Sequence, residues 1–160
     1  MTLRVAVVTV SDRSFRGERP DTSGPALADA VTAGGADVVR RELVPDDPDG
    51  LAALLGAICD GPGAPDLVLT TGGTGIGPRD RTPEATVAAC ERLVPGIPEA
   101  LRAQSLAVTP HGMLSRGVAG IRGTTLIVNL PGSTGGARDG WEVVAPIAGH
   151  AASQLRGGDH

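Results

Sequence analysis

The segment 70–80, TTGGTGIGPRD, combines glycines with an acid, a pairing that points to phosphate chemistry. Gly72, Gly73 and Gly75 can adopt positive φ angles and let backbone N–H groups approach an anion. The carboxylate of Asp80 would repel such an anion unless a cation lay between them. Because Mg²⁺ is commonly held by one or two carboxylates together with substrate phosphates, the segment predicts a magnesium-phosphate site.

The glycines fit neither of the common phosphate-binding motifs. The P-loop pattern GxxxxGK[ST] needs a lysine, and none occurs in or near this segment. The dinucleotide pattern GxGxxG fails from Gly73, because its last position is Pro78. It also fails from Gly75, because its last position is then Asp80. What remains is a general backbone cradle for an anion beside a helix N-terminus.

A second acid and a second glycine-rich turn extend this interpretation. Asp46 lies in VPDD, directly after another predicted strand, and could bind the same cation or balance its charge. The segment LPGSTGG brings Gly132 and the hydroxyls of Ser133 and Thr134 between a strand and a helix, which offers a second anion cradle. Two cradles and two acids suggest a substrate with two phosphate-bearing parts.

Each acid also has a purely structural interpretation. Helix capping by the stretch PDDPD competes with metal binding as the role of Asp46. A salt bridge to Arg79 or Arg81, or a capping role near Thr82, competes as the role of Asp80. Three arginines are candidates for holding phosphates, with ordinary surface pairing as their alternative: Arg79, Arg81 and Arg116.

The elements that must position these residues alternate between strands and helices. Strands are predicted at 3–10, 37–44, 67–70, 118–121 and 124–130, and helices at 25–33, 49–59, 83–93, 95–106 and 139–155. Thr82 is the predicted N-cap of the third helix, and Pro146 predicts a kink or a late start in the last one. This alternation indicates an α/β fold, a single doubly wound and mostly parallel sheet with helices on both faces.

Polar segments follow the predicted strands at the end where such folds bind ligands. Parallel strands bring these ends to one edge of the sheet, so the segments are expected to line a single cleft. They are 11–13, which begins with Ser11, 46–47, 71–80 and 131–136. Residues 1–155 are predicted to form the domain, and 156–160 a flexible tail.

Composition excludes several classes of function. The net charge is −4, the pI is near 5.3 and aromatics are 1% of residues, which argues against nucleic-acid binding by charge or by base stacking. No apolar run is long enough for a signal peptide or a membrane span. Cys59 and Cys90 fall in predicted helices and are interpreted as reduced, buried thiols. These features predict a soluble cytoplasmic protein.

Taken together, the motifs resemble those of the MoaB/Mog family of molybdenum-cofactor biosynthesis proteins. The resemblance covers residues 3 to about 155 and runs from TVSDRSFRGERPDTSGPAL through VPDD and TTGGTGIGPRDRTPEAT to LSRGVAGIRGTTLIVNLPGSTGGARDGWE. The combination of GGTG, PRDxTPEAT, SRxVxG and LPGS carries it, since no single piece is specific.

The resemblance implies a molybdopterin adenylyltransferase. In that reaction the terminal phosphate of molybdopterin attacks the α-phosphate of ATP, Mg²⁺ is required, and pyrophosphate is released. The two functional aspartates of the family match Asp46 and Asp80. The positions that match ligand-binding segments of the family are Gly72, Gly73, Thr74 and Gly75, then Ser115 and Arg116, and then Pro131, Gly132, Ser133 and Thr134.

The resemblance also implies a homotrimer, and hand-over of the product to a molybdenum-insertion protein. Two other functions stay open at this point. One is a non-catalytic molybdopterin-binding or scaffold member of the family. The other is a CinA-like nucleotide pyrophosphatase, which the LPGS and SRxVxG segments make the weaker alternative.

Overall fold

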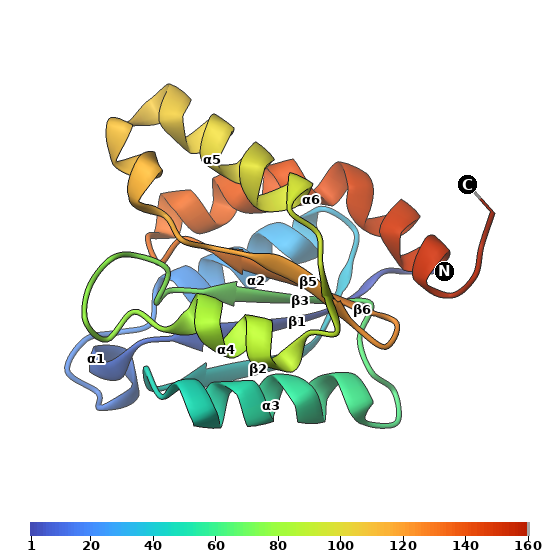
Figure 1. Cartoon of the computed structure of the whole chain (residues 1–160), viewed down its shortest axis with the longest axis horizontal. Coiled ribbons are helices and arrows are strands. Elements are labelled where there is room, and N and C mark those ends of the chain that lie inside the picture. Colours follow the sequence, from blue (N-terminus) through green and yellow to red (C-terminus); the bar gives the residue numbers. More distant parts are fainter. Residues whose placement is uncertain (160) are drawn as a thin grey trace.

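The structure, a computed structural model that describes residues 1–159, alternates strands with helices along the chain (Figure 1). The strands are β1 (Arg4–Val10), β2 (Asp37–Val44), β3 (Leu67–Thr71), β4 (Arg92–Leu93), β5 (Ala119–Arg122) and β6 (Thr125–Leu130). The helices are α1 (Asp12–Phe15), α2 (Ser23–Ala33), α3 (Pro48–Asp60), α4 (Thr82–Ala89), α5 (Gly96–Val108), the 3₁₀ helix η1 (Pro110–Leu114) and α6 (Thr134–Leu155).

Within residues 1–159 the six strands join one sheet in the order β2-β1-β3-β6-β5-β4. The first four are mutually parallel, whereas β5 is antiparallel to both β6 and β4. The β5–β6 turn is the two-residue loop that begins at Gly123, whose φ of 56° suits the first position of a type II′ turn. The predicted α/β fold with a mostly parallel sheet is confirmed.

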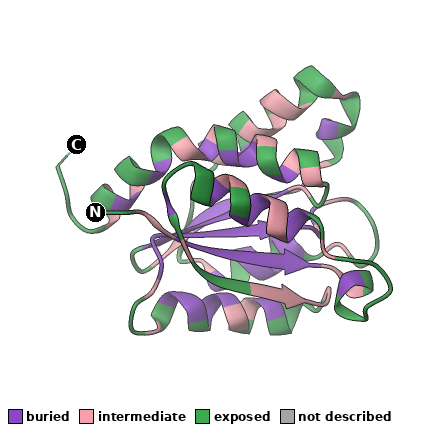
Figure 2. Ribbon diagram, turned by 180° about the vertical axis from the view of Figure 1, so that it is seen from behind, coloured by how far each residue is buried: buried purple, intermediate pink, exposed green. Residues whose placement is uncertain are grey.

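Helices cover both faces of the sheet, and the central strands β1, β3 and β6 between them are largely buried, whereas β2 and β4 are not (Figures 1 and 2). Helices α2, α5 and α6 pack on one face, where Val5 and Val7 of β1 point. Helices α3 and α4 pack on the other, against Ala6 and Val8. This alternation explains why β1 reads as a continuous apolar run, since a strand buried on both faces has no polar side.

The chain changes direction across the sheet between β1 and β3. From β1 it passes through α2 to β2 on one side, and every later strand lies on the other side of β1. The loops that leave β1 and β3 therefore diverge and open a crevice at the carboxyl ends of these strands. In doubly wound sheets this is where ligands bind.

The predicted helix at 83–93 is wrong at both ends. It stops at Ala89, because the next residues turn extended and Arg92–Leu93 pair with β5 as an edge strand. Cys90 consequently lies outside a helix and is only partly buried, whereas Cys59 is buried in α3. The predicted N-cap Thr82 is instead the first helical residue, after Arg81, and no side-chain cap bond is formed there.

The last helix also differs from its prediction. It begins at Thr134 rather than Asp139, because Ser133 caps it by accepting a 3.1 Å hydrogen bond from the N–H of Gly136. It continues through Pro146, so the predicted late start is wrong. Pro146 lies on the exposed side, where the carbonyl that loses its helical partner can bond to water.

The first and last described segments of the chain lie close together at the amino ends of the strands, on the side of the sheet opposite the crevice (Figure 1). A shallow pocket there is lined by residues 1–3 and by Arg156. The nearly buried carboxylate of Asp66 accepts a 2.9 Å hydrogen bond from the N–H of Arg4 and pairs with Arg156. Of the predicted tail, 156–160, His160 lies outside the described residues. Within residues 1–159, no helix is both long and apolar enough to cross a membrane.

Candidate functional site

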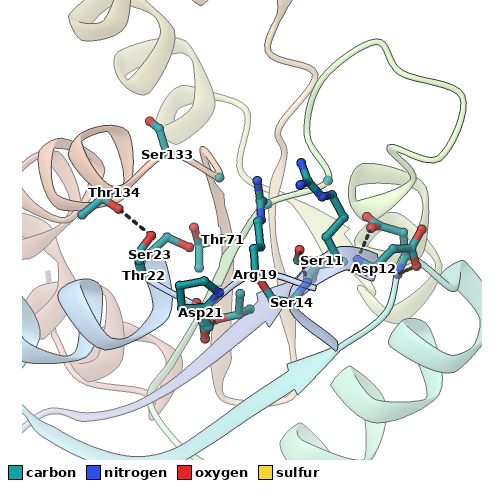
Figure 3. Close-up of a pocket in the computed structure, with 18 of the residues that line it drawn as sticks. Ser11, Asp12, Ser14, Arg19, Asp21, Thr22, Ser23, Thr71, Ser133 and Thr134 are labelled. Carbon is teal, nitrogen blue, oxygen red and sulfur yellow. Dashed lines mark hydrogen bonds between the residues drawn. The ribbon is translucent and has the colours of Figure 1, made fainter. Parts of the chain in front are cut away.

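A cleft of about 750 Å³ opens at the crevice between β1 and β3 (Figure 3). Its walls come from separate parts of the chain: the end of β1 with α1, the connection to α2, the loops after β2 and β3, and the turn before α6. Eight of the residues singled out from the sequence line it: Ser11, Asp46, Gly72, Gly73, Asp80, Gly132, Ser133 and Thr134.

Asp46 is held in the cleft by the loop after β1. Its Oδ2 accepts a hydrogen bond from the N–H of Asp12, and its own N–H donates to Asp12 Oδ1, both at 2.9 Å. The cap position of α3 is taken by Asp47, so the capping alternative for Asp46 is wrong. Partial burial, together with the charges of Asp12 and Asp80, raises the pKa of the Asp46 carboxyl above its usual value.

Asp80 approaches the same cleft from the loop after β3. Its Oδ2 accepts a 2.9 Å hydrogen bond from the N–H of Gly77, which folds the end of the loop around the carboxylate. Among residues 1–159 neither neighbouring arginine pairs with it. Arg79 binds Asp12, and Arg81 lies 3.9 Å from Glu84. The salt-bridge alternative for Asp80 therefore does not hold.

The first two glycines of the loop have the predicted left-handed backbone. Gly72 has φ 103° and Gly73 has φ 67°. A Cβ on Gly72 would strike the carbonyl of Val10, and a Cβ on Gly73 would strike the hydroxyl of Thr82. Only glycine fits either position without strain. Gly75 does not share this conformation, since its φ is not positive.

Thr82 lies beneath this loop and supports it. Its N–H donates to the carbonyl of Gly73 at 3.1 Å. Its buried Oγ1 has no hydrogen-bond partner within residues 1–159. The residue predicted to cap a helix therefore fills the space under the glycine loop instead.

Arg116 binds the outside of the glycine loop and does not line the cleft. Its guanidinium donates to the carbonyl oxygens of Gly75 at 2.8 Å and Asp80 at 2.6 Å, and it pairs with Glu84. Its backbone N–H donates to the carbonyl of Thr74 at 2.8 Å. Arg116 thus clamps both ends of the segment that carries Asp80, a role that the sequence alone did not suggest.

Arg79 binds Asp12, a residue of the cleft wall. Its Nε and Nη2 donate to the two carboxylate oxygens of Asp12, at 2.9 and 3.2 Å. This contact joins the loop after β3 to α1 and lowers the pKa of the Asp12 carboxyl. Arg79 is therefore paired with protein, and with Thr74, Gly75 and Arg116 it is absent from the cleft lining.

A second cavity of about 240 Å³ adjoins the cleft on the far side of the turn before α6. It contains Ser115 and Pro131, two residues singled out from the sequence, and it shares Ser133 with the cleft. Its other walls come from α5, α6 and the end of β6. The residues that complete it include Arg102, Gln104, Ser105, Asn129 and Asp139.

The wall formed by the connection to α2 was not singled out from the sequence. Asp21 there accepts hydrogen bonds from Thr9 Oγ1 at 2.9 Å and from the N–H of Gly24 at 3.0 Å. Thr134 Oγ1 donates to Thr22 Oγ1 at 3.0 Å, which joins this wall to α6 (Figure 3). The polar run DTSGP before a helix was the available signal for these residues.

The donor set of the cleft fits a magnesium ion that is shared with a ligand. Within residues 1–159 no cluster of three or more His, Cys, Asp or Glu side chains could hold a metal ion by itself. Mg²⁺ rarely needs one, since it keeps waters and binds one or two carboxylates together with substrate phosphates. Asp46 and Asp80 supply that number. Burial first, and then the nearby charges of Asp12 and Asp80, raise the pKa of the Asp46 carboxyl, and a cation would offset those charges.

A doubly wound sheet with acids and glycine-rich turns at its switch point is typical of proteins that bind phosphate-bearing ligands. Residues 6–150 match the family described as "Probable molybdopterin binding domain". A molybdopterin adenylyltransferase from Helicobacter pylori strain J99 is 37% identical over 98% of this chain and 89% of its own. A molybdopterin adenylyltransferase from Escherichia coli K12 is 38% identical over 93% of this chain and 77% of its own.

Among solved structures, the molybdopterin biosynthesis enzyme MoaB from Thermus thermophilus is 49% identical. The alignment covers 98% of both chains with a TM-score of 0.90. The chain belongs to the MoaB/Mog family of molybdenum-cofactor biosynthesis proteins.

Proposed function

We propose that this protein is a Mg²⁺-dependent molybdopterin adenylyltransferase, which transfers AMP from ATP to the terminal phosphate of molybdopterin. The observation that carries the proposal is the shared cleft of Asp46 and Asp80, with the glycine turns that contain Gly73 and Gly132 on its rim. Membership of a family with relatives named for this reaction supports it.

The reaction needs positioning more than covalent catalysis. An oxygen of the molybdopterin phosphate forms a bond to the α-phosphorus of ATP, and the bond from that phosphorus to the bridging oxygen of the β-phosphate breaks. The electron pair leaves with pyrophosphate. The protein must hold two anions in line and offset their charge, so no nucleophilic side chain is required.

Two adjoining cavities suit two substrates that must meet. The larger cleft, with both acids and the glycine loop, would hold the triphosphate of ATP. The smaller cavity, reached across Ser133, would hold molybdopterin, because Gln104 and Ser105 offer hydrogen bonds to a polar ring system. Ser133 and the start of α6 would then lie where the two phosphates meet, beside a helix N-terminus that favours anions.

Asp46 and Asp80 would hold the magnesium ion. When bound, the ion offsets phosphate charge and polarises the reacting phosphorus. Asp12 orients Asp46 through their reciprocal hydrogen bonds, and Arg116 orients Asp80 through the loop backbone.

The test incubates the protein with molybdopterin, Mg²⁺ and ATP labelled at the α-phosphate. Labelled molybdopterin and released pyrophosphate are expected. Tight molybdopterin binding without turnover would identify a scaffold member instead. Hydrolysis of a nucleotide in the absence of molybdopterin would identify a pyrophosphatase.

We also propose that the protein assembles as a homotrimer. A groove of about 640 Å³ between the β4–β5 edge, α5 and α6 is largely aliphatic and includes Ile97, Ile121 and Ile147. Ile147 in this groove is 41% exposed. Aliphatic surface of this kind favours burial against another copy. Light scattering coupled to size exclusion should give three times the chain mass, and a monomer mass would contradict the proposal.

A further inference from the structure

The two arginines that contact the Asp80 loop or Asp12 are already engaged with protein groups. Arg79 gives two donors to Asp12, and Arg116 spreads its guanidinium over the glycine loop and Glu84. Phosphates that enter the cleft would have to compete with these contacts. The charge that receives them must therefore be sought elsewhere in the cleft lining.

Arg13 and Arg19 line the cleft and are free. Within residues 1–159 neither side chain makes a hydrogen bond or an ion pair. The acid next to Arg19 in sequence, Glu18, is occupied by Arg16 through contacts of 2.8 and 3.2 Å. The acid next to Arg13, Asp12, is paired with Arg79. Figure 3 shows the side chain of Arg19 extending from its loop into the cavity, between Ser11 and Thr71.

The other polar groups on this side of the cleft leave the two guanidinium groups available. Asp12 is neutralised by Arg79, and both oxygens of Asp21 accept hydrogen bonds from Thr9 and from the N–H of Gly24. A free guanidinium in a cavity presents a planar set of donors that matches phosphate oxygens. Two such groups on one wall indicate a ligand part with two adjacent phosphates.

We propose that Arg13 and Arg19 form a pyrophosphate-binding pair, which holds the β- and γ-phosphates of the nucleotide and then the released pyrophosphate. The proposal rests on the proposed function of the cleft. Both arginines are exposed, whereas Asp46 and Asp80 are half-buried. The reacting α-phosphate is expected beside the acids, so the outer wall is left for the part of ATP that must depart into solvent.

Calorimetric titration with inorganic pyrophosphate in the presence of Mg²⁺ tests the pair directly. Arg13→Ala and Arg19→Ala should each weaken binding about tenfold, and the double variant about a hundredfold. ATP with a methylene bridge between its α- and β-phosphates should lose affinity in parallel. AMP, which lacks both outer phosphates, should bind as it does to the unmodified protein.

Arg41→Ala is the matched control, because it removes the same charge from an exposed position on β2, outside the cleft. Thermal unfolding should be unchanged in all variants, since neither cleft arginine makes a side-chain hydrogen bond or an ion pair within residues 1–159. Unchanged pyrophosphate affinity in the double variant would overturn the proposal. So would an unmodified protein that binds no pyrophosphate, or an equal loss of AMP affinity.

The same titration separates this inference from the proposed function. If the protein transfers AMP and the arginine variants bind pyrophosphate with unaltered affinity, the proposed function holds and the proposed role of Arg13 and Arg19 is wrong. If the variants bind pyrophosphate more weakly but the unmodified protein transfers no AMP to molybdopterin, the role of the arginine pair is supported and the proposed function is wrong.

Discussion

Asp12 and Asp46 each donate a backbone N–H to the other's carboxylate, at 2.9 Å in both directions. These two hydrogen bonds join the loop after β1 to the loop after β2, 34 positions further along the chain. They also leave the second oxygen of Asp46, Oδ1, directed toward the glycine loop, close to where a Cβ on Gly73 would lie. Neither acid caps a long helix, so the pair serves the geometry of the cleft.

Replacement of Asp12 should separate the two roles of its carboxylate. Asp12→Asn keeps an oxygen that can accept from the N–H of Asp46 but loses the ion pair with Arg79, so the free energy of unfolding should fall by less than about 1 kcal/mol. Asp12→Ala leaves that N–H without an acceptor and should cost about 1–3 kcal/mol. Urea denaturation measures both values, and equal losses would argue against the reciprocal bond.

Asp80→Asn should lose most adenylyl transfer and still bind molybdopterin. The amide keeps the shape of the side chain and can still accept from the N–H of Gly77, but it removes the charge that would bind the metal. Labelled-ATP turnover and fluorescence titration with molybdopterin give the two readouts. Asp47→Asn, exposed at the start of α3, is the control and should retain activity. Full turnover in the Asp80 variant would exclude this residue from the mechanism.

Gly73→Val should weaken ATP binding. A β-branched side chain resists the φ of 67°, and its Cβ would collide with the hydroxyl of Thr82 and approach Asp46 Oδ1 to 3.0 Å. Gly149→Val introduces the same side chain at an exposed position of α6, where a Cβ would meet nothing within 4 Å. Calorimetric titration with ATP compares the two variants. An unaltered affinity for the Gly73 variant would show that the loop is not a nucleotide cradle.

Arg116→Met should loosen the segment that carries Asp80. Hydrogen exchange in peptides that cover 74–80 should speed up, and turnover should fall by more than the affinity for molybdopterin, because the residue acts through the loop and not on the substrate. Arg122→Met is a close match, since that side chain also binds a carboxylate, Asp60, and a carbonyl oxygen, that of Ala89. Its loss should leave exchange in 74–80 unchanged. Identical hydrogen-exchange profiles for the two variants would contradict the proposal that Arg116 holds this segment in place.

Cys59 should resist alkylation in the folded protein. Burial raises the pKa of its thiol to about 11, so at pH 8 only about a thousandth is expected as the reactive thiolate. Iodoacetamide labelling followed by mass spectrometry should modify Cys90, which is half-buried, before Cys59. In urea, Cys59 and Cys90 should be labelled at similar rates. Rapid labelling of Cys59 without denaturant would contradict its burial in α3.

Local patterns in the sequence were enough to predict most of the sheet. Apolar β-branched runs predicted β1 and β3, and the polar segments after them predicted where the cleft opens. Glycines predicted the left-handed turns at 72 and 73, because no other residue adopts that backbone without strain. These features depend on neighbours in the chain, which a single sequence contains.

The features that were missed depend on distant partners. The edge strand at Arg92–Leu93 has only two residues, and its pairing with β5 makes it a strand. Arg116 was expected to hold phosphates, but its contacts with Gly75 and Asp80 exist only after β3 and the segment before β5 lie side by side. Arg19 gave no signal at all, because an unpaired cation is recognised only from the cavity around it.

The meeting of both chain ends beside Asp66 and Arg156 has a consequence for how this domain can be combined with others. Anything attached at either end would leave the molecule from the edge of the sheet opposite the cleft (Figure 1). A fusion partner or an affinity tag there would not cover the cleft. The same domain can therefore be built into larger proteins without redesign of its binding face.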